Sequence, residues 1–492
     1  MAETPNNDET SHPLEKIFHP RSTALFGVSS NAKGMASGFL TSLLEHKYHE
    51  RAPLYIINPK VDQISGIKAY GSLLDIPDPV DHVISLVPER VVPALVEQAI
   101  AKRVNSVHFY TAGFSETGDP DLMDLEKRLV GQLTESGIRV IGPNCMGLYV
   151  PQEGLAFMNG FPAEAGNVAV VSQSGANAGD MIHGLGRRGV RFSKGISFGN
   201  GADLKAHHFF DYLANDSQTE VVTAYLEGVQ EGTHFFNAVK ALAANKPVIL
   251  LKGGLTAAGA RAAQSHTGSL AGEIKIFDAM CRQAGASRAV TMDDLHDFTV
   301  ASTTTLKDIK GKGVALVSGG GGFAVLSADA IAMAGLEVPP TPDSTKEKLR
   351  EFVPVAGTSI NNPIDTNPGG DIEIWANTIE VVAKSTNIDV VFATLPWSSS
   401  STPDDENSDD TRSLESEIND YVDRLSGIQD RTEKPIVMLL RQRGDNRNSS
   451  HMFGLAAYKA GIPCFATVNR AARAAAEILD WRERRKGLPA LF

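Results

Sequence analysis

Apolar and polar positions alternate in short blocks along the chain, and one arrangement of blocks occurs three times. An apolar run of strand length is followed by a loop of Gly and Ser, and then by a helical segment. The three runs lie at Ser22–Val28, Asn167–Val171 and Gly313–Val317, and the helices extend through Leu44, Leu185 and Ala334. Short runs rich in β-branched residues and bounded by Gly, Pro, Asn or Asp are typical of buried parallel strands.

Further runs of the same kind predict seven more strands. They lie at Leu54–Ile57, His82–Val87, Ser106–Tyr110, Val221–Leu226, Val248–Leu251, Val390–Thr394 and Ile436–Leu440. Because strands alternate with helices, we expect parallel sheets with right-handed crossovers. The pattern therefore predicts an α/β fold of three doubly wound domains at 13–150, 155–305 and 312–492, after a disordered tail over 1–12.

Two segments near the C-terminus have a distinct composition. Ser398–Glu417 is polar, acidic and poor in apolar residues, so we expect a mobile surface insertion in the third domain. Ala471–Arg485 is rich in Ala and basic at its end, which suits the last helix.

Composition and charge narrow the class of protein. The chain has 492 residues and a formal net charge of -12, which argues against a general nucleic-acid binder or a polybasic membrane-surface protein. Met1–Thr10 is not a secretory signal, and no apolar stretch reaches the ~18 residues of a membrane helix. Cys145, Cys281 and Cys464 are far apart, which excludes a disulfide framework and a CxxC zinc site. We expect a cytoplasmic protein with no metal site of its own.

The three loops of Gly and Ser are candidate anion sites. Ligands of doubly wound sheets bind beyond the carboxyl ends of the strands, where helix N-termini offer N–H groups and about half a positive charge. Alternatively, Gly and Ser only make tight turns there. No Walker motif occurs, the loop from Gly27 to Gly34 lacks GxGxxG, and Gly319–Ala324 fits only the loose G-x-G-x-x-A form.

His266 is the most informative single residue. It follows the predicted strand Val248–Leu251 and a run of small residues that leave an imidazole approachable. A neutral imidazole can attack phosphorus or carbon, and its second nitrogen then needs a partner, for which Glu227 at a strand end is a candidate. The helix start at 172–175 would donate to a phosphoryl group. The alternative is a loop histidine that only makes hydrogen bonds.

Two more loops follow predicted strands. Lys60, in Asn58-Pro-Lys60, either neutralises a phosphate or is an ordinary surface lysine. Cys145, in Gly142–Gly147, is either a reactive thiol or a small buried apolar residue.

Together these segments closely resemble the NDP-forming (ADP-forming) acyl-CoA synthetase family, which includes the succinyl-CoA synthetase α subunit. The resemblance spans about residues 13–485 in family order, and Ser-His-Thr-Gly preceded by Tyr-Leu-Glu-Gly and Ser-Gln-Ser-Gly is its most specific part. The matching segments are Pro20–Ser22, Phe26–Ser30, Ile57–Lys60, Thr111–Glu116, Ile141–Cys145, Val171–Gly175, Ser197–Asp203, Tyr225–Gly228, Ser265–Gly268, Asn362–Asp365 and Ala460–Pro463.

The resemblance implies a Rossmann-like CoA-binding first domain and two flavodoxin-like ligase domains. In the first domain, Asn144 and Cys145 would lie towards the CoA thiol. The residues implied to hold the CoA nucleotide are Gly27, Ser29, Ser30, Lys33, Lys60, Val87 and Pro88.

The resemblance also implies a reaction: carboxylate, CoA and ATP give acyl-CoA, ADP and phosphate through an acyl phosphate. His266 would carry the phosphoryl group and Glu227 would orient it. The phosphoryl group would lie against Ser172, Gln173, Ser174 and Gly175. No segment has ATP-grasp character, so we expect a hetero-oligomer in which a separate ATP-grasp β subunit binds ATP/ADP and Mg²⁺. The small carboxylic acid substrate is not identified by the sequence.

Three other functions remain as alternatives. The scaffold can serve a ligase-like carbamoyl or acyl transferase that uses no ATP, or a non-enzymatic protein that binds CoA or a dinucleotide. The presence of both His266 and Glu227 favours phosphoryl chemistry. A dehydrogenase is least favoured, because the G-x-G-x-x-A match lies in the third domain without clear hydride-transfer residues.

Overall fold

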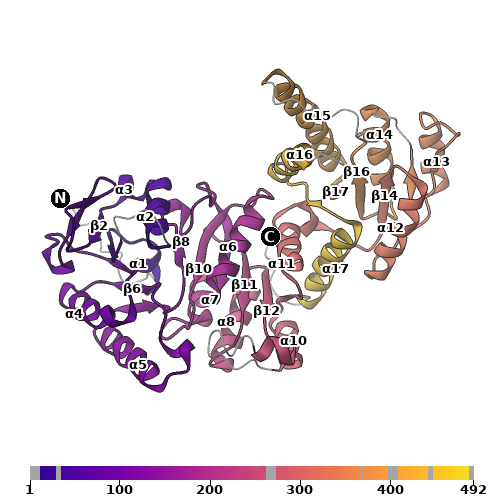
Figure 1. The fold of residues 1–492 in the computed structure, drawn as a ribbon. Helices are drawn as coiled ribbons and strands as arrows, with labels where there is room; N and C mark the ends of the chain where they lie inside the picture. Colours follow the sequence, from indigo (N-terminus) through magenta and orange to yellow (C-terminus); the bar gives the residue numbers. More distant parts are fainter. Residues whose placement is uncertain are drawn as a thin grey trace, which may run out of the picture. The chain divides into compact units, whose positions relative to one another are not determined.

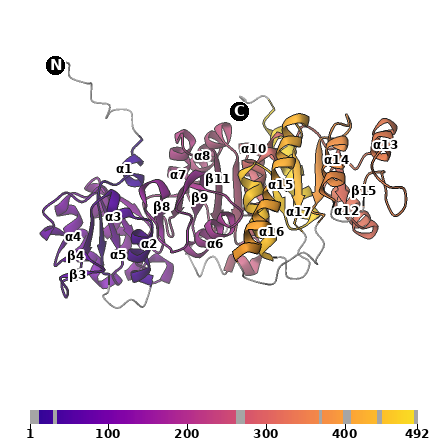
Figure 2. The same ribbon diagram turned by 90° about the horizontal axis from the view of Figure 1, so that it is seen from above.

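The computed structural model describes residues 12–28, 35–261, 273–366, 371–396, 408–440 and 447–486. The chain forms two compact units. Among the described residues, unit 1 comprises those up to His183 and those of Arg191–Arg288, and unit 2 comprises those of Gly184–Val190 and those from Ala289 onwards. Unit 1 contains two β-sheets and unit 2 contains one, and helices flank the strands of each sheet (Figures 1 and 2).

The first sheet has seven strands in the order β3-β4-β2-β1-β5-β6-β7. The strands are β1 (Thr23–Phe26), β2 (Leu54–Ile57), β3 (Gln63–Ile64), β4 (Ile67–Tyr70), β5 (His82–Ser85), β6 (Ser106–Phe109) and β7 (Arg139–Ile141). All pairs are parallel except β3 with β4. Without β3, this order is the Rossmann order, with β1 in the centre. The helices are α1 (Glu15–Phe18), α2 (Met35–Glu45), α3 (Tyr48–Arg51), α4 (Val92–Lys102) and α5 (Pro120–Glu135).

The second sheet has the order β13-β12-β11-β9-β10-β8. Its strands are β8 (Gly147–Tyr149), β9 (Ala165–Ser172), β10 (Phe192–Ser197), β11 (Val221–Leu226), β12 (Val248–Lys252) and β13 (Ser287–Ala289). Strands β9 to β12 pair in parallel, and β8 is an antiparallel edge strand on β10. Without β8, the order is flavodoxin-like. The helices are α6 (Gly175–Gly186), α7 (Ala206–Asn215), α8 (Gly232–Asn245) and α10 (Ile274–Ala284).

The sheet of unit 2 has the parallel, flavodoxin-like order β15-β14-β16-β17-β18. Its strands are β14 (Val314–Ser318), β15 (Ile364–Asp365), β16 (Val390–Thr394), β17 (Ile436–Leu439) and β18 (Cys464–Phe465). The helices are α11 (Met292–Thr303), α12 (Gly321–Met333), α13 (Asp343–Arg350), α14 (Ile372–Ala383), α15 (Ser408–Thr432), α16 (Arg447–Lys459) and α17 (Val468–Arg484).

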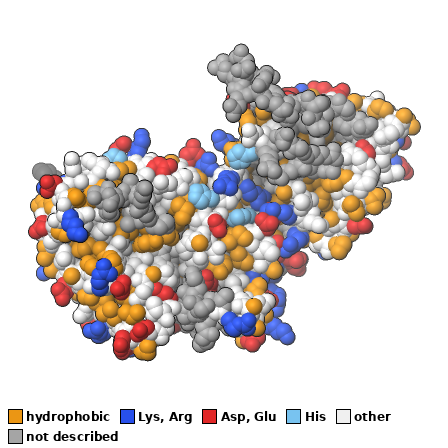
Figure 3. All heavy atoms as spheres, in the orientation of Figure 1, with side chains coloured by type: hydrophobic (Ala, Val, Ile, Leu, Met, Phe, Trp, Pro, Cys, Tyr) orange, Lys and Arg blue, Asp and Glu red, His pale blue; other side chains and the backbone are white. Residues whose placement is uncertain are grey.

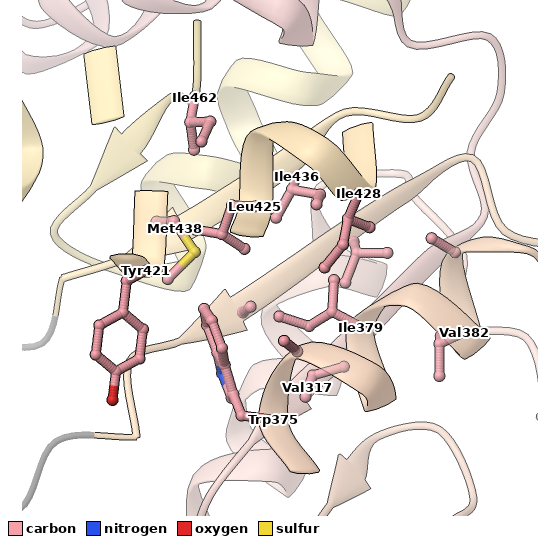
Figure 4. Close-up of a cluster of buried hydrophobic side chains, with 14 of the residues drawn as sticks. Val317, Trp375, Ile379, Val382, Tyr421, Leu425, Ile428, Ile436, Met438 and Ile462 are labelled. Atoms are coloured by element: carbon pink, nitrogen blue, oxygen red, sulfur yellow. The ribbon is translucent and has the colours of Figure 1, made fainter. Parts of the chain in front are cut away.

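Helices α14 and α15 bury one face of the unit 2 sheet. Trp375 and Ile379 of α14 meet Tyr421 and Leu425 of α15 over the strand residue Met438 (Figure 4). The apolar positions of α15 recur every three or four residues, which is the spacing of one helix face.

The predicted fold class is confirmed: three sheets, each dominated by parallel strands, follow one another along the chain. Each of the ten predicted strands coincides with an observed strand to within two residues at either end. No helix within the described ranges combines the length and the apolar character needed to cross a bilayer.

The structure corrects the prediction in three places. The β3–β4 and β8–β10 pairs are antiparallel. Residues 408–417, expected within a mobile insertion, form the start of α15, because Leu414 begins the apolar face that continues into the core; residues 398–407 lie outside the described residues. The last helix begins at Val468 rather than Ala471, because Thr467 caps the helix at that earlier position.

Two elements lie on one side of a predicted domain boundary but pack with the elements on the other side. Strand β8 precedes residue 150 but pairs with β10 of the second sheet. Helix α11 precedes residue 305 but belongs to unit 2, where it packs against α17. The chain thus crosses from the first sheet to the second immediately after the loop at 142–146.

Candidate functional site

The first sheet changes its winding direction between β1 and β5, and predicted site residues follow both strands. Gly27 comes directly after β1, and Val87 lies two residues after β5. Gly27 has φ +102°, and a Cβ atom there would lie 2.4 Å from Val87 Cγ1. A glycine is therefore required for these two strand ends to approach. Such an edge is where doubly wound sheets bind ligands.

The neighbouring strand β2 brings a lysine to the same edge. Asn58, directly after β2, donates from Nδ2 to the carbonyl oxygen of Val28 at 2.8 Å and accepts from the Lys60 amide at Oδ1. The side chains of Lys60 and Pro88 are exposed and Val87 is half-buried. Ser29, Ser30 and Lys33 lie outside the described residues.

The second sheet has its own change of direction, between β9 and β11. Gln173 follows β9 and Glu227 follows β11. Gln173 Oε1 accepts hydrogen bonds from the backbone amides of Glu227 at 2.8 Å and Gly228 at 3.1 Å. The backbone amide of Gln173 donates to the carbonyl oxygen of Tyr225. Gln173 thus joins the two strand ends, which brings the predicted segments at 172–175 and 227 together.

The turn into α6 is fixed by its own side chains. Ser172 Oγ donates to the carbonyl of Ser174 at 2.7 Å and accepts from the Ser174 amide at 3.2 Å. Ser174 Oγ accepts from the Asn177 amide. The turn therefore holds the N-terminus of a twelve-residue helix, with its N–H groups and positive dipole end, at the strand edge.

Glu227 is buried, with 5% of its surface exposed, and it lies among polar partners. Tyr225 Oη donates to Glu227 Oε1 at 3.4 Å, and Lys252 Nζ donates to the Glu227 carbonyl oxygen at 2.9 Å. Burial, followed by the charge of Glu227, raises the pKa of Tyr225 to about 12, so the phenol stays a donor at neutral pH. Burial lowers the pKa of Lys252, and the charge of Glu227 partly opposes this shift.

His266 lies outside the described residues. The described chain leaves strand β12 at Lys252, which pairs in register with Leu226, the residue before Glu227. The described residues after this strand, up to Arg261, therefore leave it at the end beside Glu227.

A cavity of about 270 Å³ lies where the loop after β7 faces the start of α6. It brings Asn144 and Cys145, predicted near the CoA thiol, together with Ser174 and Gly175, predicted near the phosphoryl group. The described residues that line it are Tyr110, Ala112, Asn144, Cys145, Met146, Gln173, Ser174, Gly175 and Ala176. Two site halves that the sequence placed in different domains thus share one cavity.

Cys145 has the character of a buried apolar residue. Its side chain is 3% exposed, and its Sγ lies 3.7 Å from the carbonyl oxygen of Phe109. Burial raises the pKa of the Cys145 thiol far above its usual range. Of the two alternatives from the sequence, this environment favours a neutral thiol in the cavity wall over a nucleophile.

Contacts of the loop after β10 with two other loops hold the cavity wall in place. Asn200 Nδ2 donates to Glu116 Oε2 at 2.7 Å and to Ser115 Oγ at 3.1 Å, while its Oδ1 accepts from Asn144 at 3.4 Å. Beside it, Gly199 touches the main chain of the 142–146 loop: a Cβ atom there would lie 2.3 Å from the carbonyl oxygens of residues 143 and 144.

An ion pair reinforces the same junction. Arg139 on β7 binds both carboxylate oxygens of Asp203, at 2.8 and 2.9 Å, and Asp203 also accepts from the Val140 amide at 2.8 Å. Bidentate pairs of this kind fix geometry as well as adding energy. The first sheet is thereby fastened to the loop after β10 of the second sheet.

Sequence reasoning did not assign roles to Met146, Asn200 or Lys252. Asn200 had one signal, since it lies in the Gly-containing segment Ser197–Asp203 that matches the family. Met146 and Lys252 had none, because a methionine after a loop and a lysine closing an apolar strand are common. On the face of unit 1 drawn in Figure 3, charged side chains of both signs are scattered among uncharged ones.

Comparisons with known proteins agree with this geometry. The family profile "CoA binding domain" matches residues 21–151, and "Succinyl-CoA ligase like flavodoxin domain" matches residues 165–302. An ADP-forming acetate–CoA ligase II subunit alpha from Pyrococcus furiosus is 35% identical over 77% of this chain and 82% of its own length. An ADP-forming acetate–CoA ligase I from Archaeoglobus fulgidus is 34% identical, but the chain covers only 55% of it.

A solved structure covers almost the whole chain. The apo form of the dinucleotide forming acetyl-coenzyme A synthetase 1 of Ca. Korarchaeum cryptofilum has a TM-score of 0.81 and 26% identity, over 97% of this chain and 100% of that one. Fold and site together define a protein of the CoA-ligase class. The chain belongs to the NDP-forming acyl-CoA synthetase family, which the sequence motifs had indicated.

Proposed function

We propose that this chain is the α-type subunit of an ADP-forming acid–CoA ligase. It converts a carboxylic acid, CoA and ATP into acyl-CoA, ADP and phosphate, through an acyl phosphate and a phosphohistidine at His266. The observation that carries the proposal is the cavity in which Asn144 and Cys145 face the N-terminus of α6. Named relatives with ADP-forming CoA ligase activity support the reaction class.

CoA binds as a substrate at the carboxyl edge of the first sheet. The contact of Gly27 with Val87 supports this site. Because residue 27 has no side chain, backbone groups are exposed to a ligand where the winding direction of the sheet changes. Exposed Lys60, with Lys33, would neutralise phosphate charge of the nucleotide, Ser29 and Ser30 would donate hydrogen bonds, and Pro88 would only pack against it. The CoA thiol would then reach the cavity at Asn144 and Cys145.

The start of α6 stabilises the phosphoryl group. In the direction that consumes acyl-CoA, inorganic phosphate attacks the acyl-CoA carbonyl, which releases CoA and leaves an acyl phosphate. The His266 imidazole then attacks phosphorus, the carboxylate leaves, and the helix N-terminus with Ser174 balances the negative charge. Glu227 accepts a hydrogen bond from the imidazole N–H, which holds the ring in position and stabilises the cation that develops. Each step runs in both directions.

The step with the nucleotide belongs to an ATP-grasp subunit that binds ATP or ADP with Mg²⁺. Two Pyrococcus furiosus relatives named as alpha subunits support a separate chain. Phosphohistidine would pass its phosphoryl group to ADP on that subunit, which regenerates the neutral imidazole.

The test needs only this chain. We expect incubation with acetyl-CoA and labelled inorganic phosphate to put an acid-labile, base-stable label on the protein, with release of CoA and acetate in equal amounts. The label should vanish in His266→Asn. In Glu227→Gln the label should fall by about 10²-fold or more, because a positioned hydrogen-bond partner contributes on that order.

Circular dichroism of each variant provides the control for folding. A label that survives in His266→Asn would remove that residue from its role. Transfer of the acyl group to an acceptor without any phosphate requirement would instead favour the transferase that uses no ATP.

A further inference from the structure

Met146 separates two cavities of unit 1. Its side chain lines the cavity of about 270 Å³ at the start of α6, and it also lines a second hollow of about 10 Å³ behind the 142–146 loop. The residue is 6% exposed. No other described residue lines both spaces.

The hollow behind Met146 is mostly apolar. Its walls include Phe39 and Leu43 of α2, Leu148 of β8, and Phe157. His82 and His108 also line it, and burial keeps both imidazoles neutral by lowering their pKa values. A space of this volume holds one group of the size of a water molecule, so it is a gap in the packing behind the methionine rather than a second binding site.

The main chain of Met146 is anchored, and its side chain fills space left by a glycine. The Met146 amide donates to Ser197 Oγ at 3.0 Å, which anchors the backbone. A Cβ atom at Gly175 would lie 2.6 Å from Met146 Cγ, so the absence of a side chain at 175 is what gives the methionine its space. An unbranched thioether is the side chain that adapts most readily to an irregular gap.

We propose that Met146 determines which acyl groups the ligase accepts, by closing the reaction cavity against the apolar hollow. This inference rests on the proposed function, because it assumes that the acid binds in the cavity at the start of α6. The described residues that line that cavity carry uncharged side chains, which suits an uncharged part of the acid at Met146. The residue limits how long or how bulky that uncharged part can be.

The test compares acyl groups of increasing size in one assay. Labelling of the chain by labelled phosphate is measured with acetyl-CoA, butyryl-CoA and phenylacetyl-CoA, for wild type and Met146→Ala. We expect the rate with phenylacetyl-CoA relative to acetyl-CoA to rise at least tenfold in the variant, because space for one methylene in an apolar pocket changes selectivity by about 10–200-fold. Butyryl-CoA should show an intermediate gain.

Two further variants keep the test decisive. Met146→Val shortens the side chain with less loss of packing, so it serves if the alanine variant does not fold. Its expected gain in the ratio of phenylacetyl-CoA to acetyl-CoA is in the same direction but less than the tenfold expected for alanine. Met158→Ala is the matched control: Met158 contacts Gly179 of α6 in the same unit but lines neither cavity, so its selectivity ratio should equal that of wild type.

The outcomes separate the two proposals. If no acyl-CoA labels the wild type, the proposed function fails. If acetyl-CoA labels the wild type and the folded variants, but the ratio between acyl groups is the same in Met146→Ala, Met146→Val and Met158→Ala, the proposed function stands and the role of Met146 is refuted.

Discussion

Two glycines in one loop differ in what surrounds them. Gly199 and Gly201 both have positive φ, at +55° and +64°, in the loop after β10. A Cβ atom at 199 would lie 2.3 Å from two carbonyl oxygens of the 142–146 loop, whereas at 201 the nearest heavy atom is 3.4 Å away. The backbone conformation is shared, but only Gly199 is required for the contact between the loops.

We therefore expect Gly199→Ala to impair the site more than Gly201→Ala does. Both variants pay for the left-handed backbone with about 1 kcal/mol, but only Gly199→Ala must also displace Asn144. Misplacement of about 1 Å costs on the order of 10²-fold in rate, so acetyl-CoA-dependent labelling should fall by that order at 199 alone. Equal rates in the two folded variants would contradict this account of the loop contact.

Two buried histidines make stability depend on pH. Burial lowers the pKa of His82 to about 3 and that of His108 to about 4, from 6.5 in the unfolded chain. At pH values between the folded and unfolded pKa values, the unfolded state binds more protons than the folded state. The contribution of these histidines to folding stability is therefore fully present above about pH 6.5, and it is lost as the pH drops towards 4.

We expect His108→Gln to weaken this dependence. One titrating histidine contributes up to about 1.4 kcal/mol per pH unit within the window, so the variant should lose less stability than wild type between pH 6.5 and 4.5. The measurement is the thermal denaturation midpoint at several pH values. His49→Gln, at an exposed position, should follow the wild-type curve. Parallel curves for His108→Gln and wild type would show that His108 does not contribute to the pH dependence.

At the scale of elements, unit 2 offers a matched pair of tryptophans. Trp375 of α14 donates from Nε1 to the Thr394 carbonyl oxygen at 2.9 Å. Trp481 of α17 is also buried, but within the described residues its Nε1 has no hydrogen-bond partner. We expect Trp375→Phe to cost about 1 kcal/mol more than Trp481→Phe, because only the first leaves an acceptor unpaired. Urea denaturation of both variants measures the difference, and equal costs would show that the bond to Thr394 adds nothing.

The elements that the sequence predicted are those with a strong local signal. Strands such as Val221–Leu226 are buried on both faces, so their apolar runs are continuous and their ends are marked by turn residues. Strands β3, β15 and β18 have two residues each, which is too short for any periodic pattern. The start of α15 was missed because its first two turns are polar and its apolar face begins only at Leu414.

The site was predictable in its parts but not in its assembly. Strand-end positions marked Gly27, Gln173 and Glu227, since ligands of such sheets bind there. That Asn144 and Cys145 face the start of α6 depends on β8 pairing with β10, a contact between residues about 50 positions apart that no local pattern encodes.

At the scale of the whole molecule, the proposal divides the reaction between chains. We expect this chain alone to be labelled from acetyl-CoA and phosphate but to form no ADP from ATP, acetate and CoA. Addition of an ATP-grasp subunit should start ADP formation, and His266→Asn should abolish it while leaving CoA binding within about twofold. ADP formation by the purified chain alone would place nucleotide binding on this polypeptide and overturn the division.

The ion pair and hydrogen bonds that join the two sheets of unit 1 have a consequence for making hybrid enzymes. Arg139 pairs with Asp203, and Asn200 pairs with Glu116 and Asn144, so residues before or within the crossover at 142–146 are bound to residues after it. A hybrid that takes its N-terminal part from a related enzyme and is spliced near residue 150 would inherit only one side of each pair. Such hybrids should regain an ordered junction only when the segment 197–203 is exchanged along with the donor part.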